Sequence, residues 1–118
     1  MLQMQKVAKS FGATKALHWV DLAVEAGSVL ALIGENGAGK STLMNVLAGV
    51  HRPDAGTMTL ADRPYQPSDP QEARRQGVVM IHQELTLAPD LSVAENIVLG
   101  AEPRAAGCVR GAQMRRVA

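Results

Sequence analysis

Hydrophobic positions along the chain follow patterns that predict several β-strands. Residues 28–33 and 78–81 form apolar runs of strand length, as in parallel strands buried on both faces. Residues 20–24 alternate between apolar and polar or small side chains, which predicts a strand with one buried face. Weaker patterns at residues 2–7 and 57–60 predict two more strands. Together with the helices described next, these strands indicate an α/β fold.

Two helices are predicted, the first from its apolar pattern and the second from signals at its ends. Residues 40–48 carry apolar side chains over most of the helix circumference, which predicts a buried helix, and Gly49 can end it. A second, short helix is expected to begin after Asp69, with Pro70 at its first position, and to stop at Gly77.

A third helix is predicted close to the end of the patterned region. Ser92 and Glu95 have the spacing of a capping box, which opens a helix through about Leu99. From Gly100 onward the chain is rich in Ala, Gly and Arg and is weakly patterned. We expect this tail to add one helical turn, at residues 114–117.

The composition is that of a globular protein and excludes several function classes. Apolar residues make up 47% of the 118 residues, enough for a core in one domain or a piece of one. A net charge of +1 and an aromatic content of 3% give no basis for nucleic-acid binding. The single cysteine, Cys108, cannot form an internal disulfide, which suits a reducing compartment. With no run of 18 apolar residues and no signal peptide, any membrane connection is expected to go through a partner.

The motif that carries chemistry is a phosphate loop of the form G-x-x-x-x-G-K-S. Its residues are Gly34, Glu35, Asn36, Gly37, Ala38, Gly39, Lys40 and Ser41. The glycines let the backbone turn its N–H groups inward as a nest for polyphosphate oxygens. The Lys40 ammonium reaches the outer phosphates, the Ser41 hydroxyl can ligate Mg²⁺, and the following helix points its positive end at the same anion. A glycine-rich turn without a ligand is the alternative, and the predicted strand before the loop and helix after it argue against that reading.

Three segments together resemble a known family. Residues 34–49, GENGAGKSTLMNVLAG, resemble the Walker A segment of ATP-binding cassette proteins. Residues 79–99, VMIHQELTLAPDLSVAENIVL, are similar to the Q-loop region of ATP-binding subunits of carbohydrate importers of the ribose, xylose and galactoside type. Residues 9–12 and 15–17 fit the opening strand and aromatic loop of the same family. The resemblance covers roughly residues 2–104.

The resemblance implies a fold and a set of partners. The fold would be an incomplete ATPase core with an N-terminal antiparallel β portion. Residues 1–104 would be the N-terminal part of a nucleotide-binding domain, and residues 105–118 a tail. Such subunits bind ATP and Mg²⁺, pair with a second cassette, and lie on the inner face of the cell membrane through a membrane permease. They energise sugar import by closing two cassettes around ATP, and hydrolysis resets them.

The resemblance also implies roles for particular residues. Phe11 would stack on adenine, residues 34–42, ending at Thr42, would hold the triphosphate, and Lys40 would assist catalysis. Gln83 would approach Mg²⁺ and the attacking water and would sense the membrane subunit. The alternatives are a core position for Phe11, the only phenylalanine, and an ordinary polar strand end for Gln83.

Three elements of a working cassette are missing from the sequence: an LSGGQ-type signature, a Walker B strand ending in Asp-Glu, and a later switch histidine. The run at residues 78–81 is no Walker B strand, because His82 stands where the metal-binding Asp should be. We therefore expect nucleotide contact without meaningful turnover, as in the N-terminal piece of a longer subunit. A non-catalytic nucleotide-binding or interaction fragment is the alternative. A small GTPase or kinase is disfavoured, since N-K-x-D and D-x-x-G motifs are lacking.

Overall fold

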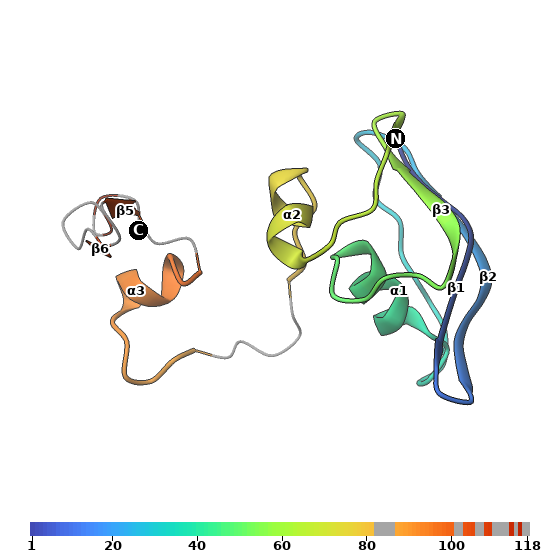
Figure 1. Cartoon of the computed structure of the whole chain (residues 1–118), viewed down its shortest axis with the longest axis horizontal. Coiled ribbons are helices and arrows are strands. Elements are labelled where there is room, and N and C mark those ends of the chain that lie inside the picture. The colour runs from blue at the N-terminus through green and yellow to red at the C-terminus, as the bar shows by residue number, and fades with distance from the viewer. Residues whose placement is uncertain (82–86, 101–102, 106–107, 110–113, 115, 117–118) are drawn as a thin grey trace. The chain divides into compact units, whose positions relative to one another are not determined.

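The computed structural model describes residues 1–81, 87–100, 103–105, 108–109, 114 and 116 (Figure 1). The chain divides into two compact units, Met1–Ile81 and His82–Ala118. The first unit holds the sheet and the two helices that pack beside it, and the second holds a short helix and a small hairpin.

A four-stranded antiparallel sheet with the order β2-β1-β3-β4 dominates the first unit. Its strands are β1 (Leu2–Phe11), β2 (Thr14–Val24), β3 (Ala55–Leu60) and β4 (Arg63–Pro64). A tight hairpin joins β1 to β2, with Phe11 opposite Thr14, and β3 returns along the other edge of β1. The strands predicted at residues 2–7, 20–24 and 57–60 are therefore confirmed, as is the expected N-terminal antiparallel portion.

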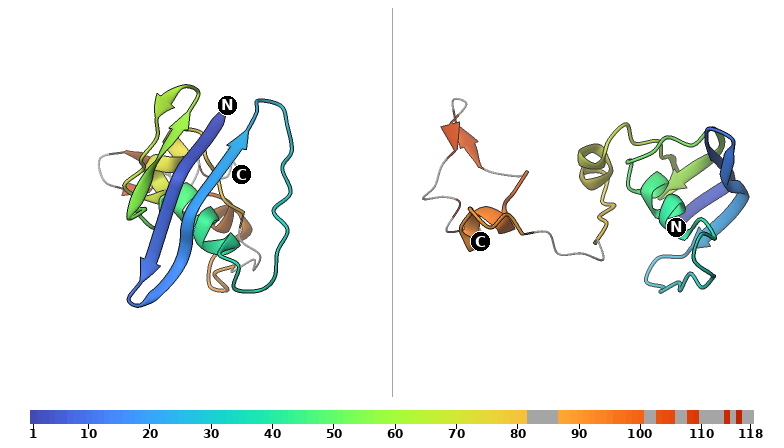
Figure 2. Two further views of the ribbon diagram at one scale, coloured as in Figure 1. Left: turned by 90° about the vertical axis from the view of Figure 1, so that its right-hand side faces the viewer. Right: turned by 90° about the horizontal axis from the view of Figure 1, so that it is seen from below.

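Helix α1 (Lys40–Leu47) packs against one face of this sheet, as the right-hand view of Figure 2 shows. The predicted helix at residues 40–48 is thus confirmed, and Gly49 follows it in the left-handed region with φ 75°. The buried cluster between sheet and helices comprises Met4, Val7, Leu17, Leu43, Val46, Met58, Tyr65 and Ala73. The Tyr65 hydroxyl donates to the carbonyl oxygen of Leu47 at 2.7 Å, which ties the connection after β4 to the end of α1.

Helix α2 (Pro70–Arg75) begins where the sequence predicts. The Asp69 carboxylate accepts from the backbone N–H of Glu72 at 2.8 Å, so it caps the helix, and Pro70 occupies the first position. The helix ends before Gly77, which has φ 95°. The cap therefore fixes where α2 begins, through contacts between residues close together in the sequence.

The buried strands predicted at residues 28–33 and 78–81 are wrong. Val29 and Ile33 are 98% and 95% exposed, and Ile81 is 89% exposed. The left-hand view of Figure 2 shows the first of these segments as an extended trace outside the sheet. A parallel strand buried on both faces needs neighbouring strands and covering helices, whereas every strand pair in the described part of the chain is antiparallel. Both apolar segments therefore lie outside the strands, and of the second one Val78 still packs partly against the core.

The second unit contains α3 (Val93–Ile97) and a hairpin of β5 (Arg104–Ala105) and β6 (Cys108–Val109). The predicted capping box is present, since the Ser92 side chain accepts from the Glu95 N–H and the Glu95 carboxylate accepts from the Ser92 N–H. The β5–β6 hairpin lies in the tail, where no strand was predicted. Of the helical turn expected at residues 114–117, positions 114 and 116 are helical and the other two lie outside the described residues.

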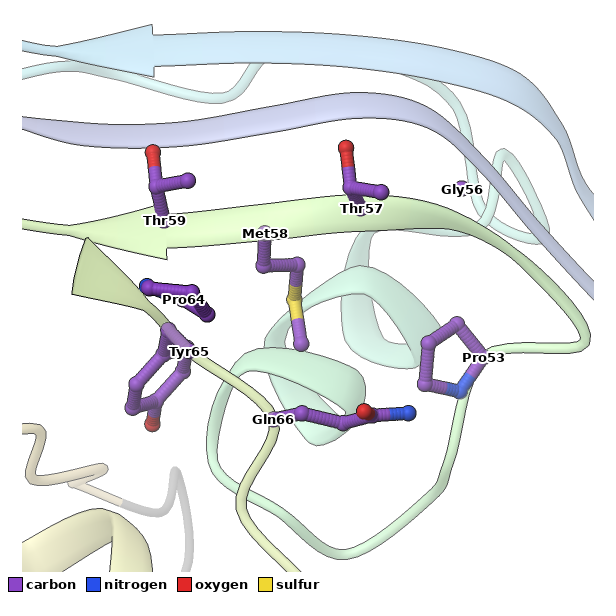
Figure 3. Close-up of a pocket in the computed structure, with 8 residues that line it drawn as sticks. All are labelled: Pro53, Gly56, Thr57, Met58, Thr59, Pro64, Tyr65 and Gln66. Atoms are coloured by element: carbon purple, nitrogen blue, oxygen red, sulfur yellow. The ribbon is translucent and has the colours of Figure 1, made fainter. Parts of the chain in front are cut away.

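A pocket of about 360 Å³ opens between β3 and the connection that follows β4 (Figure 3). Met58 leaves β3 on the side of α1, and Thr57 and Thr59 leave it on the opposite side. None of the residues that line this pocket belongs to the predicted phosphate site. Among the described residues, no helix is long and apolar enough to cross a membrane.

Candidate functional site

The predicted phosphate loop lies between the extended apolar segment and the first turn of α1. Its backbone turns tightly at residues 36–37, and the Ala38 N–H donates to the carbonyl oxygen of Glu35 at 3.2 Å. Gly37 and Gly39 have φ values of 86° and 85°, in the left-handed region that favours glycine. The loop therefore has the kind of backbone that a nest for phosphate oxygens requires.

Gly39 anchors the loop to the sheet. A Cβ atom built on Gly39 would collide with the carbonyl oxygen of Ala16 and would lie 3.1 Å from Cδ2 of Leu17. The missing side chain therefore lets the start of α1 approach the backbone of β2 directly. This contact holds the loop in place even though the segment before it is not paired in a sheet.

The Lys40 side chain folds back over the loop that precedes it. Its ammonium donates to the carbonyl oxygens of Gly34 and Glu35, at 2.5 Å and 2.7 Å. The positive charge is thus held within the loop, beside the start of α1. A phosphate group entering the loop would meet this ammonium and form a charge-assisted hydrogen bond with it.

The N-terminus of α1 has no side-chain cap and no acidic residue in its first turn. The first helical bond runs from the Leu43 N–H to the Gly39 carbonyl at 2.9 Å, so the amides of residues 40–42 come before it. These amides and the helix dipole favour an oxyanion, and a polyphosphate therefore fits this end of the helix.

The Ser41 hydroxyl is exposed on the first turn of α1, and Thr42 beside it is half-buried. Among the described residues there is no cluster of three His, Cys, Asp or Glu side chains that could hold a metal ion. Mg²⁺ usually takes one or two protein ligands and completes its shell with phosphates and water. The residues present therefore suit Mg²⁺ delivered together with a nucleotide, for which the exposed Ser41 hydroxyl would be the protein ligand.

Phe11 lies at the end of β1, in the hairpin whose second strand touches the loop. Its side chain is 45% exposed, so the alternative of a core phenylalanine is wrong. The His51 ring meets it edge to face, with centroids 5.0 Å apart and an angle of 71° between the ring planes. The Lys9 ammonium lies 5.7 Å from the Phe11 ring centroid.

Asp54 ties the turn between α1 and β3 (residues 48–54), which carries His51, to the end of β1. Its carboxylate accepts from the Lys9 ammonium and from the Ser10 N–H, both at 2.7 Å, and its own N–H donates to the Ala8 carbonyl at 2.8 Å. The Lys9 hydrogen bond, followed by that of Ser10, lowers the pKa of Asp54 below its ordinary value. The carboxylate is therefore ionised at neutral pH and holds this contact together.

The sequence around the phosphate loop matches a known protein family. The family described as "ABC transporter" matches residues 17–118. The chain belongs to the ABC transporter family.

Relatives within the ABC transporter family include proteins named for ribose import. A "Ribose import ATP-binding protein RbsA 2" from Streptomyces avermitilis is 55% identical over 104 residues, which are 88% of this chain and 21% of the relative. A "Ribose import ATP-binding protein RbsA" from Geobacillus kaustophilus is 48% identical over 120 residues, 100% of this chain and 24% of that protein. The chain therefore spans between a fifth and a quarter of the length of these relatives.

Solved ABC transporter cassettes share the fold. A nucleotide-free ATP-binding cassette matches with a TM-score of 0.77 and 31% identity, over 99% of this chain and 45% of that one. A dimeric cassette in a post-hydrolysis state, bound to ADP and phosphate, matches with a TM-score of 0.74 and 26% identity, over 98% and 53%. The predicted fold class, an incomplete ATPase core of the ABC type, is thereby confirmed.

Two residues of the candidate nucleotide site differ from the sequence-based expectation: Gln83 was predicted but is not placed, and His51 was not predicted. Gln83, predicted to contact Mg²⁺ and the attacking water, lies outside the described residues. His51, for which the sequence pattern indicates no role, contacts Phe11. The Asp54 contacts bridge 44 and 45 positions of sequence, so no local pattern signals them.

Proposed function

We propose that residues 34–42 bind the triphosphate of Mg-ATP as the N-terminal part of a cassette, residues 1–104, that energises sugar import. The observation that carries the proposal is the loop itself. Two left-handed glycines, a lysine ammonium held over the backbone and an uncapped helix N-terminus converge on one anion site. The names of the relatives specify ribose as the sugar of those proteins and support a pentose or similar sugar here.

Each group in the loop has a distinct part in binding. The amides at the start of α1 hold the phosphate oxygens, and the Lys40 ammonium moves from the loop carbonyls to the outer phosphates. The Ser41 hydroxyl would ligate Mg²⁺, and Phe11 would supply an aromatic surface for the base. Gln83, which the family resemblance assigns to the attacking water, would have this role only in a protein that hydrolyses ATP. Bound Mg-ATP supplies the phosphoryl group and the metal charge.

Hydrolysis needs groups that this chain does not carry. The signature sequence, the Walker B carboxylates and the switch histidine have no counterparts in the sequence. Each missing group that stabilises transferring charge is worth several kcal/mol of barrier, at about 1.4 kcal/mol per factor of ten in rate. The chain therefore binds nucleotide without measurable turnover, and turnover requires a longer protein that contains these groups.

The proposal includes the partners and the location of the import machinery. A second cassette would close over the nucleotide, and a matching cassette that is dimeric with ADP and phosphate bound supports such pairing. A membrane permease would hold the subunit at the cytoplasmic face of the membrane, which the names of the import relatives support.

Calorimetric titration of the purified chain with Mg-ATP tests the binding site. We expect saturable binding that Lys40→Ala weakens at least tenfold. Lys6→Ala is the matched control: it removes another lysine whose ion pair with Asp21 is exposed, so nucleotide binding should not change. Absence of Mg-ATP binding by the folded parent chain would refute the proposal.

A phosphate-release assay tests the expected lack of turnover. The parent chain should release phosphate from ATP no faster than Lys40→Ala does. A clear excess rate in the parent would show that the loop and its neighbours suffice for hydrolysis, which would refute the expected lack of turnover.

A further inference from the structure

We propose that His51 is a positioning residue for the Phe11 ring, and through that ring for the base of a nucleotide held at the phosphate loop. This inference rests on the proposed function and extends it to a residue at the opposite end of α1 from the loop. His51 acts by fixing the orientation of Phe11, and it has no contact of its own with the phosphates.

The ring pair has a geometry that orients an aromatic side chain. The His51 and Phe11 centroids are 5.0 Å apart and the planes meet at 71°, within the range of favourable edge-to-face pairs. The Lys9 ammonium, 5.7 Å from the same centroid, adds a cation–π contact. These neighbours restrict the ring, and its 45% exposure leaves surface on which a base can stack.

The turn that carries His51 is itself held against the strand that carries Phe11. Three hydrogen bonds connect Asp54 to residues 8–10 of β1, two of them to the ionised carboxylate. The His51 N–H donates to the Asn45 carbonyl at 3.2 Å, which joins the same turn to α1. His51 is therefore a fixed support for Phe11, because both of its flanks are bonded to ordered elements.

Strand β2 connects the Phe11 ring to the phosphate loop over a short distance. Phe11 pairs with Thr14 across the hairpin, and two residues further along β2 the Ala16 carbonyl contacts Gly39. Two strand residues span about 7 Å. A nucleotide whose phosphates occupy the loop therefore places its base within reach of Phe11.

Binding of ATP and of inorganic tripolyphosphate, each with Mg²⁺, separates a role at the base from a general structural role. We expect His51→Ala to weaken ATP binding about fivefold, the factor that a ring pair of this kind is worth. Tripolyphosphate affinity should not change, because this ligand has no base. His51→Phe keeps an aromatic edge and should restore ATP affinity to within about twofold of the parent.

A double-mutant cycle shows whether His51 acts through Phe11. In a Phe11→Ala background, His51→Ala should cause no further loss of ATP affinity. His18→Ala is the matched control, because His18 is an exposed histidine beside Trp19 and should leave both affinities unchanged. If His51→Ala loses its circular dichroism signal, His51→Leu, which is closer in volume, replaces it in every arm.

The outcomes are distinguishable. Equal losses of ATP and tripolyphosphate affinity, an additive loss in the Phe11→Ala background, or no loss in ATP affinity overturns the role of His51 while the proposed function stands. A parent chain that binds neither ligand overturns both. Selective loss of ATP affinity, restored by His51→Phe and absent without Phe11, establishes the positioning role.

Discussion

Replacing Gly39 by alanine tests how the phosphate loop is anchored. The added methyl group would collide with the Ala16 carbonyl oxygen, a backbone atom of β2 that cannot rotate away. It would also press on Leu17 Cδ2 at 3.1 Å, and the residue would have to keep a φ of 85°. Both effects destabilise the folded state at one position.

The magnitude follows from adding these two effects. An alanine in the left-handed region costs about 1–2 kcal/mol, and overpacking against fixed neighbours costs about 1–3 kcal/mol more. We therefore expect Gly39→Ala to lower the free energy of unfolding by about 2–5 kcal/mol. That is a large share of the stability of a small domain.

Two other glycines in the same loop serve as controls. Gly37 has nearly the same φ, 86°, but a Cβ there meets nothing within 4 Å, so Gly37→Ala should cost only the backbone part, about 1–2 kcal/mol. Gly34 has no positive φ, and its Cβ would meet Ala38 at 3.4 Å, so Gly34→Ala should be nearly neutral. Urea unfolding, followed by circular dichroism and Trp19 fluorescence, measures all three. Equal losses for Gly39→Ala and Gly37→Ala would refute the contact with β2.

The remaining predictions concern hydrogen bonds elsewhere in the chain. Tyr65→Phe removes the donor to the Leu47 carbonyl and should cost about 1–3 kcal/mol of unfolding free energy in the same urea assay, because that acceptor is left in a partly buried site. Asp69→Ala removes the cap of α2 and should cost about 1 kcal/mol, whereas Asp69→Asn should retain most of the stability. The pKa of Asp54 is lowered from its ordinary 3.8 by hydrogen bonds from the Lys9 side chain and the Ser10 N–H. The ionised carboxylate should therefore stabilise the fold fully above pH 3.8, and this contribution is lost as the pH falls through the lowered pKa. The difference in unfolding free energy between the parent and Asp54→Asn should accordingly shrink toward zero in acid. Asn96 bonds to the backbone of residues 88, 91 and 92, and Asn96→Ala should speed amide hydrogen exchange over residues 88–92 while leaving exchange in β1 unchanged.

Signals that act within a few residues predicted their elements well. Asp69 and Ser92 mark helix starts because each caps an amide three positions away, so the whole interaction is written in a short stretch of sequence. The phosphate loop is equally local, and the structure gives it the expected glycine conformations at Gly37 and Gly39.

Burial could not be predicted in the same way. The apolar runs at residues 28–33 and 78–81 have strand composition, but burial of a strand depends on neighbours far away in sequence, and no described strand pairs with either run. The support of Phe11 by His51 was missed for a related reason. Asp54 brings the two rings together through bonds to positions 44 and 45 residues earlier, which no local pattern records.

Helix α1 connects two places at which the chain is attached to the β1–β2 hairpin. Gly39 packs against β2 at the start of the helix, and beyond its end Asp54 is hydrogen-bonded to β1. The eight residues of α1 span about 12 Å. Because the start of α1 and the segment beyond its end are both attached to the same pair of strands, we expect the insertion or deletion of one helical turn in α1 to break one of these two attachments.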